Sequence, residues 1–170
     1  HLDVHKDFDE YLNAKRNIIR FQKSSDVTIW NQRNQFSSQI AHSNDTISIP
    51  YLTELGSYAK DGYFWFRRKK LCSVDVLKLP GEHNIENACA AITASRYFIE
   101  NDFADAVEKG LSSFAGLPHR LNFVREVEGV GYYDDSIATT PGSAIAALRA
   151  FTEPKIIILG GSDKGAEYQE

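Results

Sequence analysis

A few side chains have the types and spacing to do chemistry, and Arg120 is the most suggestive of them. It follows the predicted end of a helix, because Gly116 suits the left-handed end of a helix and Pro118 prevents a new helix from starting there. A guanidinium binds phosphate or carboxylate through two parallel hydrogen bonds. An arginine in a linker can equally pair with a surface carboxylate, so both interpretations stay open.

Imidazole, carboxylate and amine groups gather near the start of the chain. His1, Asp3 and His5 could ligate a metal ion, or they could form a polar loop before a helix. Lys15 falls on the apolar face predicted for that helix. Its amine either reaches water along the core surface, or it lies in a low-dielectric cleft as a neutral, reactive group.

Two further sets of polar residues stand where predicted elements begin or end. Asn84 and Asn87 precede an Ala-rich helix, where carboxamides can cap the helix or bind the edge of a base. Asp135, Thr139 and Lys164 follow the carboxyl ends of predicted strands. In open α/β sheets, ligands bind at those ends.

The elements that must position these residues alternate between helix and strand. Asp7 with Glu10 forms a capping box that starts the first helix, and Gly62 marks a turn in an antiparallel meander with aromatic cross-strand pairs. The continuous apolar run over residues 155–159 is typical of a buried parallel strand. We predict helices over 7–22, 88–94, 103–114 and 142–151, and strands over 26–31, 46–49, 52–58, 63–66, 71–77, 121–127, 131–135 and 155–159.

This order predicts an α/β chain that ends in the opening of a doubly wound domain. The glycine-rich loop over residues 160–165 lacks the Lys-Ser/Thr ending of a P-loop. The first helix is expected to bury Phe8, Tyr11, Leu12, Ile18 and Ile19.

Composition narrows the classes of function. The 170 residues carry a net charge of −4, which argues against a general nucleic-acid surface, and the basic run at 67–70 is interpreted as a solvated turn. No apolar run approaches membrane-spanning length, and we find no signal peptide. Cys72 and Cys89 have no ligand-like spacing, which fits a reducing cytosol.

Taken together, five motifs in order resemble the Mur ligases, which form amide bonds at the expense of ATP. They lie at 1–15, 79–87, 114–120, 134–136 and 160–164, and the hinge Leu117-Pro118-His119-Arg120 resembles the D-glutamate-adding members. The resemblance implies that residues 1–118 are the C-terminal part of a central ATP-binding domain, made of helices and a β-meander. Residues 119–170 would begin a Rossmann-like C-terminal domain that binds the amino acid. The P-loop would lie upstream of His1, so the chain alone is expected not to hydrolyse ATP.

The reaction implied by the resemblance belongs to peptidoglycan precursor synthesis in the cytoplasm. ATP phosphorylates the terminal carboxylate of UDP-N-acetylmuramoyl-L-alanine, and the amine of D-glutamate attacks the acyl phosphate. Mg²⁺ would assist, and the enzyme is expected to act as a monomer, without nucleic acid or membrane. The alternatives are another Mur-type or folylpolyglutamate-type ligase, or a non-catalytic nucleotide-binding fragment.

The resemblance also assigns roles around the nucleotide and the metal ion. His1 would coordinate Mg²⁺, and Lys15 would be carbamylated, which turns an amine into the anionic oxygen ligand that a hard cation prefers. Asn84 and Asn87 would bind the adenine. Arg120 would reach the ATP phosphates when the domains close.

The remaining roles concern the ribose and the amino acid. Asp135 would bind the ribose, while Thr139 and Lys164 would hold the carboxylates of D-glutamate, with Lys15 and Lys164 serving in catalysis. Many family members carry Asp-Ser-Lys-Ala-Thr-Asn where this chain has Ile137 and Thr140 at the third and sixth positions. Ile137 removes a cation near the nucleotide and the amino acid.

Overall fold

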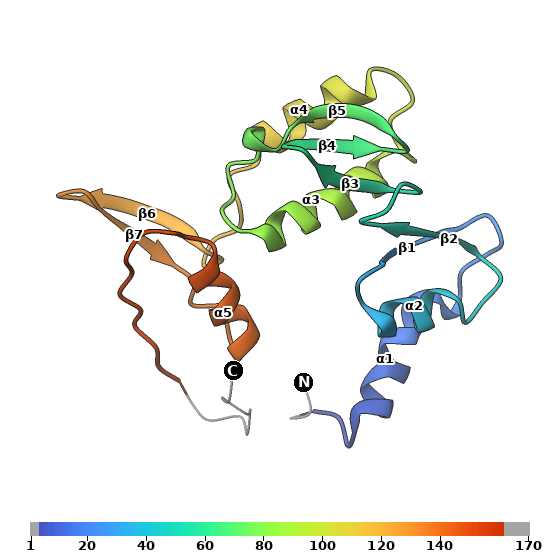
Figure 1. Ribbon diagram of the computed structural model, residues 1–170. Coiled ribbons are helices and arrows are strands. Elements are labelled where there is room, and N and C mark those ends of the chain that lie inside the picture. The colour runs from blue at the N-terminus through green and yellow to red at the C-terminus, as the bar shows by residue number, and fades with distance from the viewer. Residues whose placement is uncertain (1–3, 162–170) are drawn as a thin grey trace.

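The computed structural model describes residues 4–161 as three successive parts, drawn from blue to red in Figure 1. The first part contains two helices and a parallel pair of strands, in register from Val27 opposite Ile47 to Asn31 opposite Tyr51. Its elements are α1 (Phe8–Arg20), β1 (Val27–Asn31), α2 (Gln35–Ala41) and β2 (Ile47–Tyr51).

Helix α1 begins as the sequence predicts, because the Asp7 carboxylate accepts a hydrogen bond from the Glu10 backbone N–H at 2.9 Å. Leu12 and Ile19 are buried on its inner face. The prediction that Phe8 and Ile18 join them is wrong, because these residues are 42% and 79% exposed. Successive helical residues are about 100° apart around the axis, so the buried stripe includes Ile19 and excludes its neighbour.

The second part is the predicted antiparallel meander, covered by two helices. Its strands are β3 (Ser57–Lys60), β4 (Tyr63–Phe66) and β5 (Lys69–Ser73), followed by the 3-10 turn η1 (Val74–Val76). The rings of Tyr58 and Trp65 stack across two strands with centroids 6.3 Å apart. The first strand starts later than predicted, because residues 52–56 form the turn between β2 and β3. The last strand ends earlier than predicted, because the residues after Ser73 form η1.

The basic run lies at the second turn of the meander. Arg67 and Arg68 occupy the turn with positive φ, and Lys69 and Lys70 open β5. The predicted turn is therefore confirmed for the first two residues of the run.

Helices α3 (Glu82–Ser95) and α4 (Phe103–Ser113) close the core of this part. The small residues of α3 allow the close approach that the sequence predicts, and Cys89 and Ile92 are buried against Phe64 and Phe66. Burial raises the pKa of the Cys89 thiol to about 11, so this sulfur stays protonated and unreactive at neutral pH.

A fully buried hydroxyl connects α3 to the meander. Thr93 Oγ1 accepts a hydrogen bond from the Ser57 backbone N–H at 2.9 Å and donates one to the Cys89 carbonyl at 2.8 Å. Next to it, Gly56 leaves no room for a side chain, because a Cβ there would stand 2.4 Å from the Pro50 carbonyl oxygen. The end of β2, the start of β3 and α3 therefore meet at one point.

Thr93→Val is expected to destabilise the protein by ~1–3 kcal/mol, because it leaves the Ser57 N–H buried without an acceptor. Urea unfolding of the full-length protein measures the change. Thr93→Ser is the matched control, since it keeps the hydroxyl and loses one methyl group, which costs about 0.8 kcal/mol. A serine variant less stable than the valine variant would contradict this role of the hydroxyl.

The third part is a hairpin and one helix. Strands β6 (Asn122–Val127) and β7 (Val130–Asp134) join at the predicted turn, where Glu128 and Gly129 have positive φ. Helix α5 (Pro141–Arg149) follows, capped by the Thr140 side chain, which accepts from the Ser143 backbone N–H.

The predicted strand over residues 155–159 is not formed. This stretch pairs with no strand within residues 4–161, and Ile156 and Ile158 are 97% and 95% exposed. A parallel strand needs a parallel neighbour, and β7, the nearest strand in sequence, pairs only with antiparallel β6 in the part that the structure describes. Within residues 4–161 the chain is mixed α/β as predicted, but the doubly wound opening is absent. None of the helices described is both long and apolar enough to cross a membrane.

Candidate functional site

Lys15 stands exposed on α1, with its Nζ 5.4 Å from the centroid of the Tyr11 ring. Of the two predicted environments, the structure therefore shows the solvated one, with the ammonium near the face of an aromatic ring. His1, the other predicted metal ligand, lies outside the described residues. Among residues 4–161, no three His, Cys, Asp or Glu side chains gather where they could hold a metal ion.

The start of α3 carries the two predicted adenine residues. Asn84 Nδ2 donates to the Pro80 carbonyl at 2.8 Å, and Asn87 Nδ2 approaches Asn84 Oδ1 at 3.4 Å. Gly81 occupies the N-cap with φ 96° and offers no capping side chain. Asn84 thus braces the first turn of the helix, while Asn87 is exposed beside it.

Sequence reasoning missed a polar cluster that joins this helix to the parallel strands. Arg33 Nη1 lies 2.5 Å from Glu86 Oε1 and 3.5 Å from Glu82 Oε1, and its backbone N–H donates to Asn31 Oδ1 at 2.8 Å. Burial raises the pKa of the Tyr51 hydroxyl, and a hydrogen bond with Asn31 partly offsets that rise.

Asn31 and Tyr51 end β1 and β2, so the cluster occupies the carboxyl edge where α/β sheets bind ligands. The same rule of strand ends, applied to residues 27–31, would have indicated Asn31 and Arg33 but not the partner Glu86, which is 53 residues away.

Residues 119–121, which include the end of the hinge, are joined by three hydrogen bonds to the last residue of β7 and the loop that follows it. His119 Nδ1 lies 2.7 Å from Asp134 Oδ2, the Leu121 backbone N–H donates to Asp135 Oδ1 at 2.9 Å, and the Ile137 N–H donates to the His119 carbonyl at 3.2 Å. We call residues 119–121 and 134–137 together the hinge clip.

Asp134 is the carboxylate of the hinge clip that pairs with His119. The Ser136 backbone N–H, at 2.9 Å from Asp134 Oδ1, and then His119 hold the pKa of this carboxyl below its usual value. The group is therefore ionised at neutral pH and can accept from both partners.

Arg120 lies inside the hinge clip, with an exposed side chain. Its backbone N–H donates to the Leu117 carbonyl, but its guanidinium forms no hydrogen bond or ion pair with any residue of the described range 4–161. The surface ion pair considered for this arginine is therefore not formed there. Asp135 lies beside it through the bond to Leu121, and Thr139 follows at the exposed end of the same loop.

The structure thus places Arg120, Asp135 and Thr139 in or beside the hinge clip and keeps Lys15, Asn84 and Asn87 on separate elements. Lys15 belongs to α1, and Asn84 and Asn87 belong to α3. In the described part of the chain, no hydrogen bond or ion pair joins them to the hinge clip. Lys164 lies outside the described residues.

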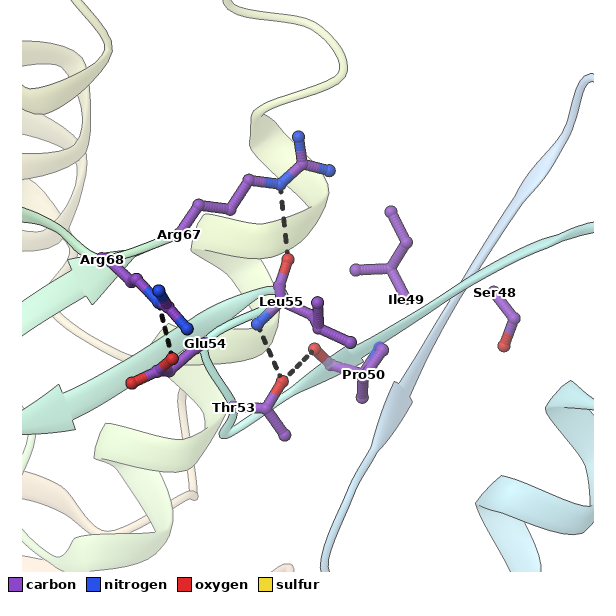
Figure 2. A pocket seen from close by; sticks show the side chains of 8 residues that line it. All are labelled: Ser48, Ile49, Pro50, Thr53, Glu54, Leu55, Arg67 and Arg68. Atoms are coloured by element: carbon purple, nitrogen blue, oxygen red, sulfur yellow. Dashed lines mark hydrogen bonds and ion pairs between the residues drawn. The ribbon is translucent and has the colours of Figure 1, made fainter.

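A hollow of about 670 Å³ lies between the end of β2, the turn that follows it and the turn between β4 and β5 (Figure 2). It contains none of the predicted site residues. Arg68 Nε is paired with Glu54 Oε2 at 2.6 Å, and Arg67 Nε donates to the Leu55 carbonyl at 3.4 Å, so the charge at this turn is partly neutralised. A second hollow, of about 490 Å³, lies between the start of α3 and the end of α5 and includes Gly81, Glu82, Ile85, Arg149 and Ala150.

Comparison with known proteins gives consistent matches. The family model described as Mur ligase middle domain matches residues 1–95. The UDP-N-acetylmuramoylalanine–D-glutamate ligase of Clostridium novyi (strain NT) is 36% identical over 173 residues, which cover 99% of this chain and 37% of that protein. The enzyme of the same name from Caldanaerobacter subterraneus subsp. tengcongensis is 35% identical, over 100% of this chain and 38% of its own length.

Among solved structures, MurF from Acinetobacter baumannii matches with a TM-score of 0.71 and 22% identity, over 86% of this chain and 33% of that one. This likeness concerns the fold, and it confirms the predicted mixed α/β class. The chain spans less than two fifths of the length of these curated relatives.

Proposed function

Because this chain belongs to the Mur ligase family, we propose that it is part of an ATP-dependent ligase that adds D-glutamate to UDP-N-acetylmuramoyl-L-alanine in peptidoglycan precursor synthesis. The observation that carries the proposal is identity of about 35% along almost the whole chain to ligases with that name. We propose a cytoplasmic location, because ATP and UDP-linked precursors are cytoplasmic, and a monomeric enzyme.

We place the boundary between the two domains near residue 118. The family match ends at residue 95, α4 ends at Ser113, and Gly116 has φ 97° before Pro118. Residues 1–118 would then belong to the central ATP-binding domain. Residues 119–170 would begin the domain that receives the amino acid.

The first chemical step transfers a phosphoryl group from ATP to the carboxylate of the muramoyl-alanine substrate. Transfer of this kind depends on positioning and on stabilising charge that spreads over the phosphoryl oxygens. Arg120 can supply that stabilisation, because its guanidinium is exposed and no described residue engages it. Asn84 and Asn87 would bind the adenine, and Asp135 the ribose.

Lys15 and His1 would hold Mg²⁺, which neutralises phosphate charge when it is bound. Mg²⁺ prefers oxygen ligands, and an amine offers none until CO₂ adds to it as a carbamate. The exposure of Lys15 fits this modification, because dissolved CO₂ can reach Nζ. Nζ lies 5.4 Å from the centroid of the Tyr11 ring, so the carbamate would form beside an aromatic side chain.

The second step forms the amide. The amine of D-glutamate attacks the acyl-phosphate carbon, the C–O bond to phosphate breaks, and the nitrogen loses a proton. Thr139 and Lys164 would hold the carboxylates of the amino acid through a hydroxyl and an ammonium. Ile137, between Asp135 and Thr139 in the sequence, brings no charge to this part of the site.

Phosphate release by the full-length protein tests the proposal. We expect release that depends on UDP-N-acetylmuramoyl-L-alanine and on D-glutamate, with other amino acids inactive. Activity with L-lysine, L-alanine or a folate in place of these substrates would assign the chain to a different ligase. Without any acceptor, phosphate release should fall to the background rate of ATP hydrolysis.

A further inference from the structure

The backbone on both sides of Arg120 is tied down, while its side chain is left unengaged by the described residues. His119 on one side is joined to Asp134 and Ile137, and Leu121 on the other side is joined to Asp135. An arginine that served only as a linker residue would need no such arrangement on both flanks.

The conformation of the two flanking residues is demanding. His119 has φ 64° and Leu121 has φ 46°, in the left-handed region that side chains disfavour. Such residues persist only where surrounding contacts fix them. Here the contacts are the His119–Asp134 pair, the bond from the Leu121 N–H to Asp135 Oδ1, and the burial of the Leu121 side chain.

We propose that His119 and Asp134 are positioning residues, which fix the backbone at Arg120 so that its guanidinium is presented to an anionic ligand. The inference rests on the proposed role of Arg120 at the ATP phosphates. When the backbone that carries a guanidinium is already fixed, the side chain loses less conformational entropy on binding. More of its interaction energy is then available to stabilise the phosphoryl group during transfer. Asp134 suits the task because it accepts from His119 with one oxygen and from Ser136 with the other.

The contribution of this pair to stability is expected to be small. The His119 side chain is 66% exposed and the Asp134 side chain 33%, and ion pairs at the surface contribute little to folding. A role in positioning and a role in folding therefore predict different measurements.

The test compares single and double variants of the full-length enzyme. His119→Phe keeps a ring and removes the bond to Asp134, and it is expected to lower kcat/KM for ATP by about tenfold while Tm stays close to that of the wild type. His119→Asn restores an amide N–H that can donate to the carboxylate, and it should recover most of the loss. Asp134→Ala should reproduce the loss from the other partner.

Epistasis with Arg120 decides the matter. In an Arg120→Ala background, His119→Phe and Asp134→Ala should have no further effect, because the side chain that they position is gone. Effects that multiply with that of Arg120→Ala would overturn the inference, as would a fall in Tm that accounts for the loss. Binding of a non-hydrolysable ATP analogue, measured by calorimetry, should weaken in the same variants.

Asp105→Ala is the matched control. This carboxylate forms an exposed ion pair with Lys109 at 2.8 Å on α4, away from the hinge, and its removal should leave kcat/KM unchanged. An error in the D-glutamate assignment can be told apart from an error in the positioning role. The same variants can be compared with whichever amino acid the enzyme accepts. A fully active Arg120→Ala enzyme would overturn both the role of Arg120 and the positioning role.

Discussion

Lys15→Ala is expected to lower kcat of the full-length ligase by about a thousandfold, the scale of effect when a group that stabilises transition-state charge is removed. On the proposed role of Lys15, the change removes the carbamate oxygens that would hold Mg²⁺ together with His1. Phosphate release at saturating ATP and acceptor measures kcat. Added bicarbonate or chloride should restore part of the activity in the alanine variant by occupying the place of the carbamate.

Lys23→Ala is the control for this prediction. Lys23 is a second exposed lysine just beyond α1, and its replacement should leave kcat and the response to bicarbonate unchanged. A fully active Lys15→Ala enzyme would show that Lys15 is only a solvated cation beside the Tyr11 ring.

Arg120→Ala should lower kcat/KM for ATP by about 10²–10³-fold, the cost of removing one charged or hydrogen-bonding group from a phosphoryl-transfer site. Because the guanidinium is exposed and engaged with no described residue, its removal should leave the urea midpoint nearly unchanged. Initial rates at varied ATP concentration measure the effect. Arg120→Lys keeps the charge but loses the planar fork, so its activity should be intermediate.

Arg125 offers a control within the same part of the chain. Its guanidinium lies 5.9 Å from the Tyr132 ring on the exposed β6–β7 hairpin, and Arg125→Ala should retain wild-type kinetics. Equal losses from the two arginines would indicate a general electrostatic effect on ATP binding rather than a specific contact.

Local features of the fold could be predicted because neighbouring residues determine them. The capping of α1 by Asp7 and the turn at Gly62 depend on side chains within a few positions. The family could be predicted from the order of five motifs, and the matches confirm it. The roles of the individual residues stay predictions.

Features that depend on distant partners were missed. Arg33 and Glu86 are 53 residues apart and His119 and Asp134 are 15 apart, so no local pattern relates them. The sequence could not decide between a solvated and a buried Lys15. The periodicity of a helix shows on which face a side chain lies, but it does not show whether other elements bury that face. Residues 155–159 have the composition of a strand, but composition does not supply the neighbour with which a strand must pair.

That exposed run also has a consequence for self-association. Ile156, Ile157, Ile158 and Leu159 are uncharged and β-prone, and their backbone groups pair with no other described residue. This is the pattern of a segment that adds strands from other copies of itself. Pro154 and Lys155 flank the run on one side as gatekeepers. Lys155 is a weak one, because its amine is held at 2.7 Å by the Leu148 and Phe151 carbonyls at the end of α5. These residues therefore favour aggregation of the protein until another surface covers them.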